Sequence, residues 1–347
     1  MRSESTHVNY RPKRSTAIVL ATILIATPVR AQGPTIRYGT KVSADVKRIY
    51  QRGLEYLIRS QQQDGSWVAG DQNGITGLCV LAFLADGEDP NFGAHAIYVR
   101  KGIERIVRSQ DARTGYIPNS MYNHGFATLA LAEAYGSVDD RSLTAPRSIG
   151  TALELAVRCA LTSQRNNRLG GWRYAPEMND ADTSVSGAVL MGLLAARNAG
   201  IEVPDTAVDR AVRYYRNSTS DTGTVAYSGG IGGLGESMNR SAVATLVFAL
   251  TKERDTKEYQ ATLGYITSRL DHQDLGYPYY FRYYMAQALF QGDFQAWTRW
   301  ERDNVHLLRD LQQEDGSFQA NHGPAYGTAM ALLSVALEFR FLPIYER

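Results

Sequence analysis

One unit recurs six times along the chain: an amphipathic helix, a glycine turn, and a second helix that is apolar nearly all round. In the first copy the turn lies at residues 60–67 and the apolar helix is predicted over 74–85. A helix without a polar face must be surrounded by protein, so each unit needs neighbours. The turn glycines, spaced by 40 to 56 residues, are Gly65, Gly115, Gly171, Gly223, Gly276 and Gly316.

The apolar helices predict how the units are arranged. They are expected over residues 74–85, 125–135, 184–196, 241–250, 280–290 and 326–337, and the amphipathic helices precede the turns, for example over 148–163 and 305–312. The first and last apolar helices are as apolar as the middle ones, whereas an open solenoid needs polar caps at its ends. We therefore predict an all-α fold: a single α/α toroid of six helical hairpins over residues 44–347.

The turn sequences have a structural interpretation. Glycine supplies the positive φ needed after a helix end, the aromatic ring covers the hairpin junction, and glutamine is expected to bond the free carbonyls of the last helical turn. We assign no catalytic role to these turns.

The N-terminus has the pattern of an export signal. A basic segment precedes an apolar run at residues 17–27, and small residues end at Ala31, where cleavage is expected. This predicts a signal peptide over residues 1–31, a linker over 32–43, and a periplasmic or secreted mature protein. The alternative is an uncleaved membrane anchor.

Charge indicates which partners are not expected, and the position of the cysteines indicates their redox state. The net charge of +2 and the charged fraction of 21% come with no basic tract, so nucleic acid is not an expected partner. Cys79 and Cys159 each lie in a predicted buried helix. Buried free thiols are therefore predicted rather than a disulfide.

Two groups of motifs resemble known families. The turns at residues 62–67 (Gln-Gln-Asp-Gly-Ser-Trp) and 312–318 (Gln-Gln-Glu-Asp-Gly-Ser-Phe) resemble the glutamine and tryptophan repeat of squalene cyclases. Residues 124–135, 171–174 and 326–332 resemble exported bacterial prenyltransferase and squalene-oxidase repeat proteins. The chain thus resembles the terpenoid cyclase and protein prenyltransferase superfamily, which implies an α/α toroid. A shared fold does not by itself imply an activity.

The resemblance can be tested for a cyclase acid. Class II terpene cyclases protonate their substrate from an Asp-x-Asp-Asp-Thr-Ala motif, and the nearest stretch here is residues 179–184. Aligned on Thr183, the proton-donating position falls on Ala181. Asp180 and Asp182 remain candidate catalytic carboxylates. The alternative is that Asp182 caps the third inner helix and Asp180 is a solvated loop residue.

The sequence also lacks the motifs of other enzymes and binding proteins with the toroid fold. Prenyltransferase zinc needs a cysteine two residues after its aspartate, and Ser184 stands there after Asp182. Neither cysteine lies in the Cys-Gly-Glu-Gln run of thioester toroids. We therefore predict no metal and no cofactor, while carbohydrate-active toroids, which use separated carboxylates, stay open.

In a toroid the N-termini of the inner helices gather at one rim, with unsatisfied amide groups and polar side chains. His124 is a further acid–base candidate, although it and His322 could simply be satisfied helix-start residues. The tyrosines could fill the core, and Arg240 could pair with Asp182. The candidate ligand-binding residues are Asn123, His124, Asp182, Arg240, Tyr280, Tyr283, Tyr284, His322 and Tyr326.

These observations favour a toroid that binds an apolar, isoprenoid-like or polymeric ligand, such as a peptide or glycan segment, without the standard catalytic motifs. The alternatives are a cyclase-like isomerase using Asp180 or Asp182, a carbohydrate-active enzyme, and a scaffold for an envelope protein partner. The shape and polarity of the ring centre should separate these functions.

Overall fold

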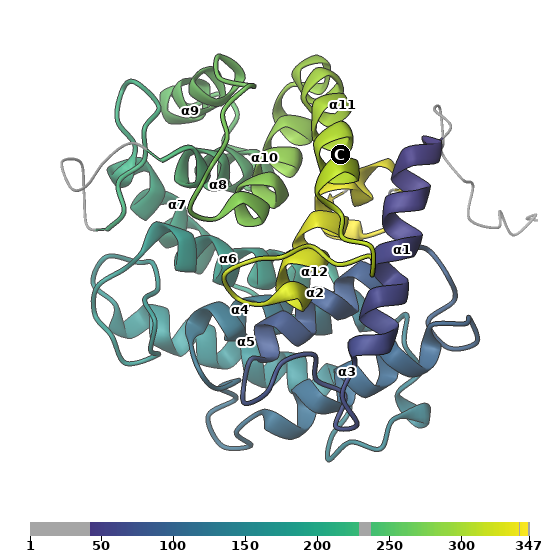
Figure 1. Ribbon diagram of the computed structural model, residues 1–347. Helices are drawn as coiled ribbons and strands as arrows, with labels where there is room; N and C mark the ends of the chain where they lie inside the picture. Colours follow the sequence, from purple (N-terminus) through teal and green to yellow (C-terminus); the bar gives the residue numbers. More distant parts are fainter. Residues whose placement is uncertain (1–41, 229–236, 340, 346–347) are drawn as a thin grey trace, which may run out of the picture. The chain divides into compact units, whose positions relative to one another are not determined.

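The computed structural model describes residues 42–228, 237–339 and 341–345 (Figure 1). The predicted signal peptide and most of the predicted linker therefore lie outside the described residues. Within the described ranges, no helix combines the length and the apolar character that crossing a bilayer requires.

The described residues form an all-helical unit, apart from one isolated bridge between Thr219 and Val225. Helices with an even number are apolar and almost completely buried, while those with an odd number are mostly amphipathic. The inner helices are α2 (Asn73–Leu84), α4 (Met121–Ala134), α6 (Thr183–Asn198), α8 (Met238–Leu250), α10 (Pro278–Gly292) and α12 (Pro324–Val335). The outer helices are α1 (Ala44–Ser60), α3 (Ala96–Ser109), α5 (Ile149–Asn166), α7 (Asp205–Ser218), α9 (Lys257–Thr267) and α11 (Phe294–Leu311). Short 3-10 turns lie at Asp140–Ser142, Ala336–Glu338 and Pro343–Tyr345.

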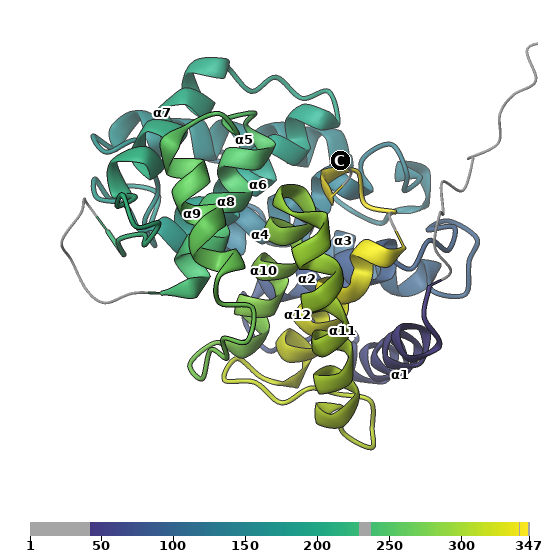
Figure 2. The same cartoon turned by 90° about the horizontal axis from the view of Figure 1, so that it is seen from above.

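The ring is closed. Each inner helix packs against the next, and α12 packs against α2, so the last inner helix meets the first. The outer helix α1 packs against both α11 and α12, beside which it lies in Figure 1. Figure 2 shows α12 near α10 and α2, the two inner helices against which it packs. The predicted α/α toroid of six hairpins is confirmed.

The largest difference from the predicted helices is in α11. It was expected over residues 305–312 but begins at Phe294, directly after Asp293, whose side chain accepts a hydrogen bond from the Ala296 amide at 2.9 Å. Trp297 and Trp300 then extend its buried face. The prediction was too short because Glu301, a charged residue, is also buried on this face and interrupts the apolar pattern.

The turn glycines allow close packing between neighbouring units. At Gly316, φ is +88° and a Cβ atom would lie 2.2 Å from the Arg52 carbonyl oxygen in α1. Equivalent approaches to the next outer helix occur at Gly65, Gly115 and Gly223. In the third turn the positive φ is at Gly170, not at the predicted position one residue later, and the fifth turn has none at its glycine. Each contact joins one turn to the following outer helix, so the turns set the spacing of the ring.

Glutamines that follow or end the outer helices also cross between units. The Gln312 side-chain amide donates hydrogen bonds to the Gly316 carbonyl and to the Ile49 carbonyl of α1, both at 3.0 Å. The same pattern occurs at Gln61, Gln110 and Gln164. The expectation that glutamine bonds the last turn of its own helix holds for Gln313, which donates to the Leu311 carbonyl of α11 at 3.0 Å, but not for these four glutamines. Because the amide carries two N–H groups, it can bridge the turn and the neighbouring helix.

Two turn tryptophans also bond the outer helix that precedes them. Trp172 is fully buried, and its indole Nε1 donates to the Ala160 carbonyl in the preceding outer helix at 2.9 Å. Trp67 donates to the Leu57 carbonyl in the same way at 2.7 Å. The predicted buried thiols are confirmed as well, since Cys79 and Cys159 are both free and buried.

Candidate functional site

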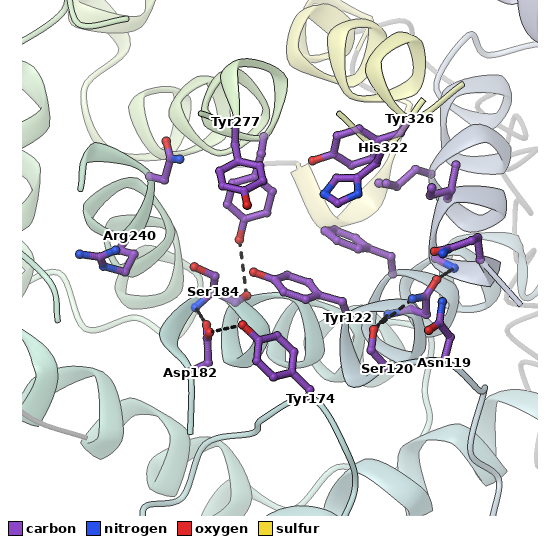
Figure 3. A pocket seen from close by; sticks show the side chains of 18 of the residues that line it. Asn119, Ser120, Tyr122, Tyr174, Asp182, Ser184, Arg240, Tyr277, His322 and Tyr326 are labelled. Atoms are coloured by element: carbon purple, nitrogen blue, oxygen red, sulfur yellow. Dashed lines mark hydrogen bonds between the residues drawn. The ribbon is translucent and has the colours of Figure 1, made fainter. Parts of the chain in front are cut away.

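A cavity of about 550 Å³ opens where the inner helices begin (Figure 3). Its walls combine aromatic rings with neutral polar side chains and two charged groups. The lining residues are Gln72, Gly74, Ile75, Leu78, Asn119, Ser120, Tyr122, Asn123, Phe126, Tyr174, Asp182, Ser184, Tyr227, Ser237, Asn239, Arg240, Tyr277, Tyr280, His322 and Tyr326. The rim predicted from the polarity of the inner helices is therefore hollow rather than filled.

The start of α4 positions one wall. Ser120 caps this helix by accepting a hydrogen bond from the Asn123 amide at 3.3 Å, and the Asn123 side chain accepts one from the Gly74 amide at 2.8 Å. These bonds tie α4 to α2 and fix the first turn of α4. Tyr122 in that turn points into the cavity (Figure 3), where its ring stacks over Phe126 at 6.3 Å.

Asp182 forms part of the opposite wall and is only 1% exposed. One carboxylate oxygen accepts hydrogen bonds from the amides of Ser184 at 2.7 Å and Val185 at 3.0 Å, which caps α6. The other oxygen accepts a bond from the Tyr174 hydroxyl at 3.2 Å. The capping interpretation is confirmed. With donors on both oxygens, the carboxylate is held as an acceptor.

The hydroxyl groups of Tyr174 and Tyr227 lie 2.6 Å apart, which extends the network from Asp182 along the wall. The Arg173 guanidinium lies 5.1 and 5.3 Å from the centres of these two rings. Arg173 also pairs with Asp180 at 3.5 Å. Asp180, with its side chain 49% exposed, lies outside the cavity and next to solvent, as the loop interpretation expected.

Arg240 lines the cavity together with Asp182, and its contacts within the described part of the chain include Val225 and Tyr227. Its Nε donates to the Val225 carbonyl at 2.8 Å, and its guanidinium lies 6.0 Å from the Tyr227 ring centre. Burial lowers the pKa of Arg240, and the negative charge of Asp182 partly opposes that shift. Asp182 thus acts on Arg240 through its field.

His124 belongs to the packing between helices, not to the cavity lining. It is fully buried, its Nδ1 accepts a hydrogen bond from the Ile117 amide at 3.2 Å, and its Nε2 lies 3.0 Å from the Ala156 carbonyl. Burial lowers its pKa to about 4, so it is neutral at physiological pH. Tyr283 and Tyr284 are also fully buried and lie outside the lining set.

His124 should make stability depend on pH. Its pKa is about 4 in the folded protein and 6.5 as the reference value, so the unfolded chain binds more protons between these values. The contribution of neutral His124 to the free energy of unfolding is therefore fully present above pH 6.5. It falls by about 3 kcal/mol in total as the pH drops toward 4. Urea unfolding across this range should show that loss in the wild type relative to His124→Gln. Burial raises the pKa of Glu133 to about 7, so its contribution to stability changes with pH in the opposite direction. That contribution is the same in both proteins and cancels in the comparison.

Several lining residues were not singled out from the sequence. Tyr122 adjoins the predicted Asn123, and Tyr174 and Tyr227 come from the segments that lead into α6 and α8. The signal that could have found them is proximity to an inner-helix start. Among the predicted residues, the structure gathers Asn123, Asp182, Arg240, Tyr280, His322 and Tyr326 around the cavity.

The described lining residues include one carboxylate, Asp182, and one permanent cation, Arg240. A pair of carboxylates of the kind that glycoside hydrolysis uses is therefore not formed by these residues. What they provide is a set of aromatic faces, hydroxyl groups and amides around an open space. Such a surface is suited to binding.

The chain matches one described family in sequence and several proteins in structure. A family profile described as "Domain of unknown function (DUF6288)" matches residues 46–332. No curated protein matches the sequence. A D-mannose isomerase is similar in structure, with a TM-score of 0.59 and 11% identity over 86% of this chain and 99% of that chain. The type II terpene cyclase MstE from Scytonema gives a TM-score of 0.58 and 15% identity over 87% of this chain and 100% of that chain. A glycosidase variant gives a TM-score of 0.55 and 13% identity over 86% of this chain and 98% of that chain. These likenesses show the α/α toroid fold, on which different chemistries occur.

Proposed function

The chain belongs to the family described as "Domain of unknown function (DUF6288)", and we propose from the cavity itself that it binds a neutral carbohydrate. The observation that carries this proposal is the mixture of aromatic faces and neutral polar groups around one open cavity of about 550 Å³. The proposal is for binding, since the described lining residues do not form a pair of catalytic carboxylates.

The aromatic groups provide flat faces on the two sides of the cavity. Tyr277 and His322 stack at 6.2 Å between ring centres, and Tyr326 lies edge-on to His322 at 5.2 Å. Tyr122 lies across from them in Figure 3. A sugar ring has apolar C–H faces and a polar edge, so it can pack on such rings while its hydroxyl groups reach the wall.

The polar groups favour a hydroxyl-rich ligand over an isoprenoid. Asn119, Ser237 and His322 line the cavity, and the side-chain oxygen of Asn239 is buried with no hydrogen-bond partner among the described residues. A hydrocarbon ligand would remove these groups from water without bonding them, at roughly 1–3 kcal/mol each. The opposite charges of Asp182 and Arg240 balance, which favours a neutral ligand.

Direct binding measurements test the proposal. Neutral mono- and oligosaccharides, first on a glycan array and then by calorimetry, are expected to bind the wild type. Tyr122→Ala should weaken binding at least tenfold because it removes an aromatic face, whereas Tyr135→Ala, at an exposed tyrosine outside the cavity, should leave it unchanged.

Geranylgeraniol and squalene serve as comparison ligands. If these are retained and no saccharide binds, the carbohydrate proposal is wrong and the isoprenoid alternative is favoured. If neither class binds, the scaffold alternative gains support. Circular dichroism of both variants would verify that they fold.

A further inference from the structure

We propose a second site at the other end of α2: Asp86, Glu88 and His95 form a binding site for a divalent transition-metal ion, with zinc the best match. One side-chain ligand atom from each residue can be chosen so that all three lie within 4.8 Å of one another. This proposal does not depend on the carbohydrate cavity.

The chain brings the three residues together at the loop between α2 and α3. Asp86 follows the end of α2, Glu88 lies in the loop, and His95 directly precedes α3. The carbohydrate cavity is lined by Gly74 and Ile75 at the opposite end of α2. A helix of 12 residues separates the two ends by about 18 Å, so the sites are distinct.

The distances fit metal ligands better than a hydrogen-bonded ion pair. The Nδ1 atom of His95 lies 3.4 Å from a Glu88 carboxylate oxygen and 3.6 Å from an Asp86 carboxylate oxygen. A charged N–H to carboxylate hydrogen bond is about 2.7–2.9 Å long. By contrast, ligand atoms at about 2.0–2.2 Å from a tetrahedral zinc ion are about 3.3–3.6 Å apart. Both observed separations fall in or at the edge of that interval.

The His95 imidazole has a ring nitrogen that is free to coordinate a metal ion. Its Nδ1 is buried and forms no hydrogen bond within the described part of the chain, although two carboxylates lie beside it. The Phe83 ring packs against it at 5.4 Å between ring centres. A buried ring nitrogen without a hydrogen bond is costly, and coordination of a metal ion would satisfy it.

The charges also favour a dication. Two carboxylates and a neutral imidazole carry a formal charge of −2, which a divalent ion neutralises. A nitrogen and oxygen ligand set suits zinc more than calcium or magnesium, which prefer oxygen alone. The prediction of no metal rested on the absence of a cysteine thiolate, which this set of ligands does not use.

Titration of the tag-free, EDTA-treated full chain with zinc chloride tests the site. Calorimetry should show one equivalent bound by the wild type. His95→Gln and Glu88→Gln should each weaken binding at least about 100-fold, more than the roughly 10–100-fold typical of groups that only support a ligand. His306→Gln, at an exposed histidine in α11, is the matched control and should bind zinc as the wild type does.

Cobalt provides a geometric readout. Cobalt(II) added to the wild type should give the intense visible bands of a tetrahedral ion, and these should disappear in Glu88→Gln. Glu88 is the most exposed of the three side chains at 41%, so this variant keeps the test usable if His95→Gln fails to fold. Absence of zinc uptake by the wild type, or uptake that neither variant reduces, overturns the proposal and leaves an ordinary ion cluster.

Discussion

Replacing Trp172 by alanine is expected to lower the free energy of unfolding by about 3–5 kcal/mol, the range for truncating a buried tryptophan. The side chain is fully buried, and its indole Nε1 bonds the Ala160 carbonyl at 2.9 Å. The variant therefore loses packing and the indole hydrogen bond to that carbonyl. Urea unfolding followed by circular dichroism at neutral pH measures the loss.

Trp172→Phe separates the two contributions, because it keeps an aromatic ring at the hairpin junction but removes the indole donor. It should be destabilised by less than the alanine variant. A loss below about 1 kcal/mol for Trp172→Ala would contradict the assignment of this residue to the core.

Replacing Gly316 by alanine should destabilise the ring at its closure. The residue has φ of +88°, and an added Cβ would lie 2.2 Å from the Arg52 carbonyl oxygen of α1. That oxygen belongs to helix backbone, so relief requires α1 to move away from the last turn. We expect the free energy of unfolding to fall by at least about 3 kcal/mol, which exceeds the roughly 1–2 kcal/mol cost of a left-handed backbone alone.

Gly200→Ala is the matched control for this variant. Gly200 has a similar φ of +92°, but nothing lies within 4 Å of its added Cβ. The difference between the two variants in denaturant unfolding therefore isolates the contact between the last turn and α1. Equal losses would show that backbone conformation, and not ring closure, requires glycine at position 316.

The two proposed sites use different residues, so each can be tested without changing the other. The cavity lies at the start of the inner helices and uses aromatic and neutral polar groups. The proposed metal site lies after the end of α2 and uses two carboxylates and an imidazole. Zinc binding should therefore persist in Tyr122→Ala, and saccharide binding should persist in Glu88→Gln.

The sequence by itself determined the number of hairpins and the closure of the ring. Inner helices with no polar face cannot be stable unless protein surrounds them, and this holds whatever their exact neighbours are. Local patterns also predicted the cap formed by Asp182 as one of two interpretations, since an aspartate directly before an apolar helix bonds the amides of its first turn. Of the two buried cysteines, Cys79 lies in the apolar inner helix α2, and Cys159 lies on the buried face of the outer helix α5.

The tertiary structure alone decided which residues of the rim face the cavity. Tyr122 and His124 are two positions apart on α4, yet the first lines the cavity and the second bonds Ala156 in α5. Residues two apart on a helix do not face the same way, and the rotation of the helix about its axis is set by the helices that pack around it. The same reason applies to Asp86, Glu88 and His95, because only the packing of the loop between α2 and α3 brings their side chains together.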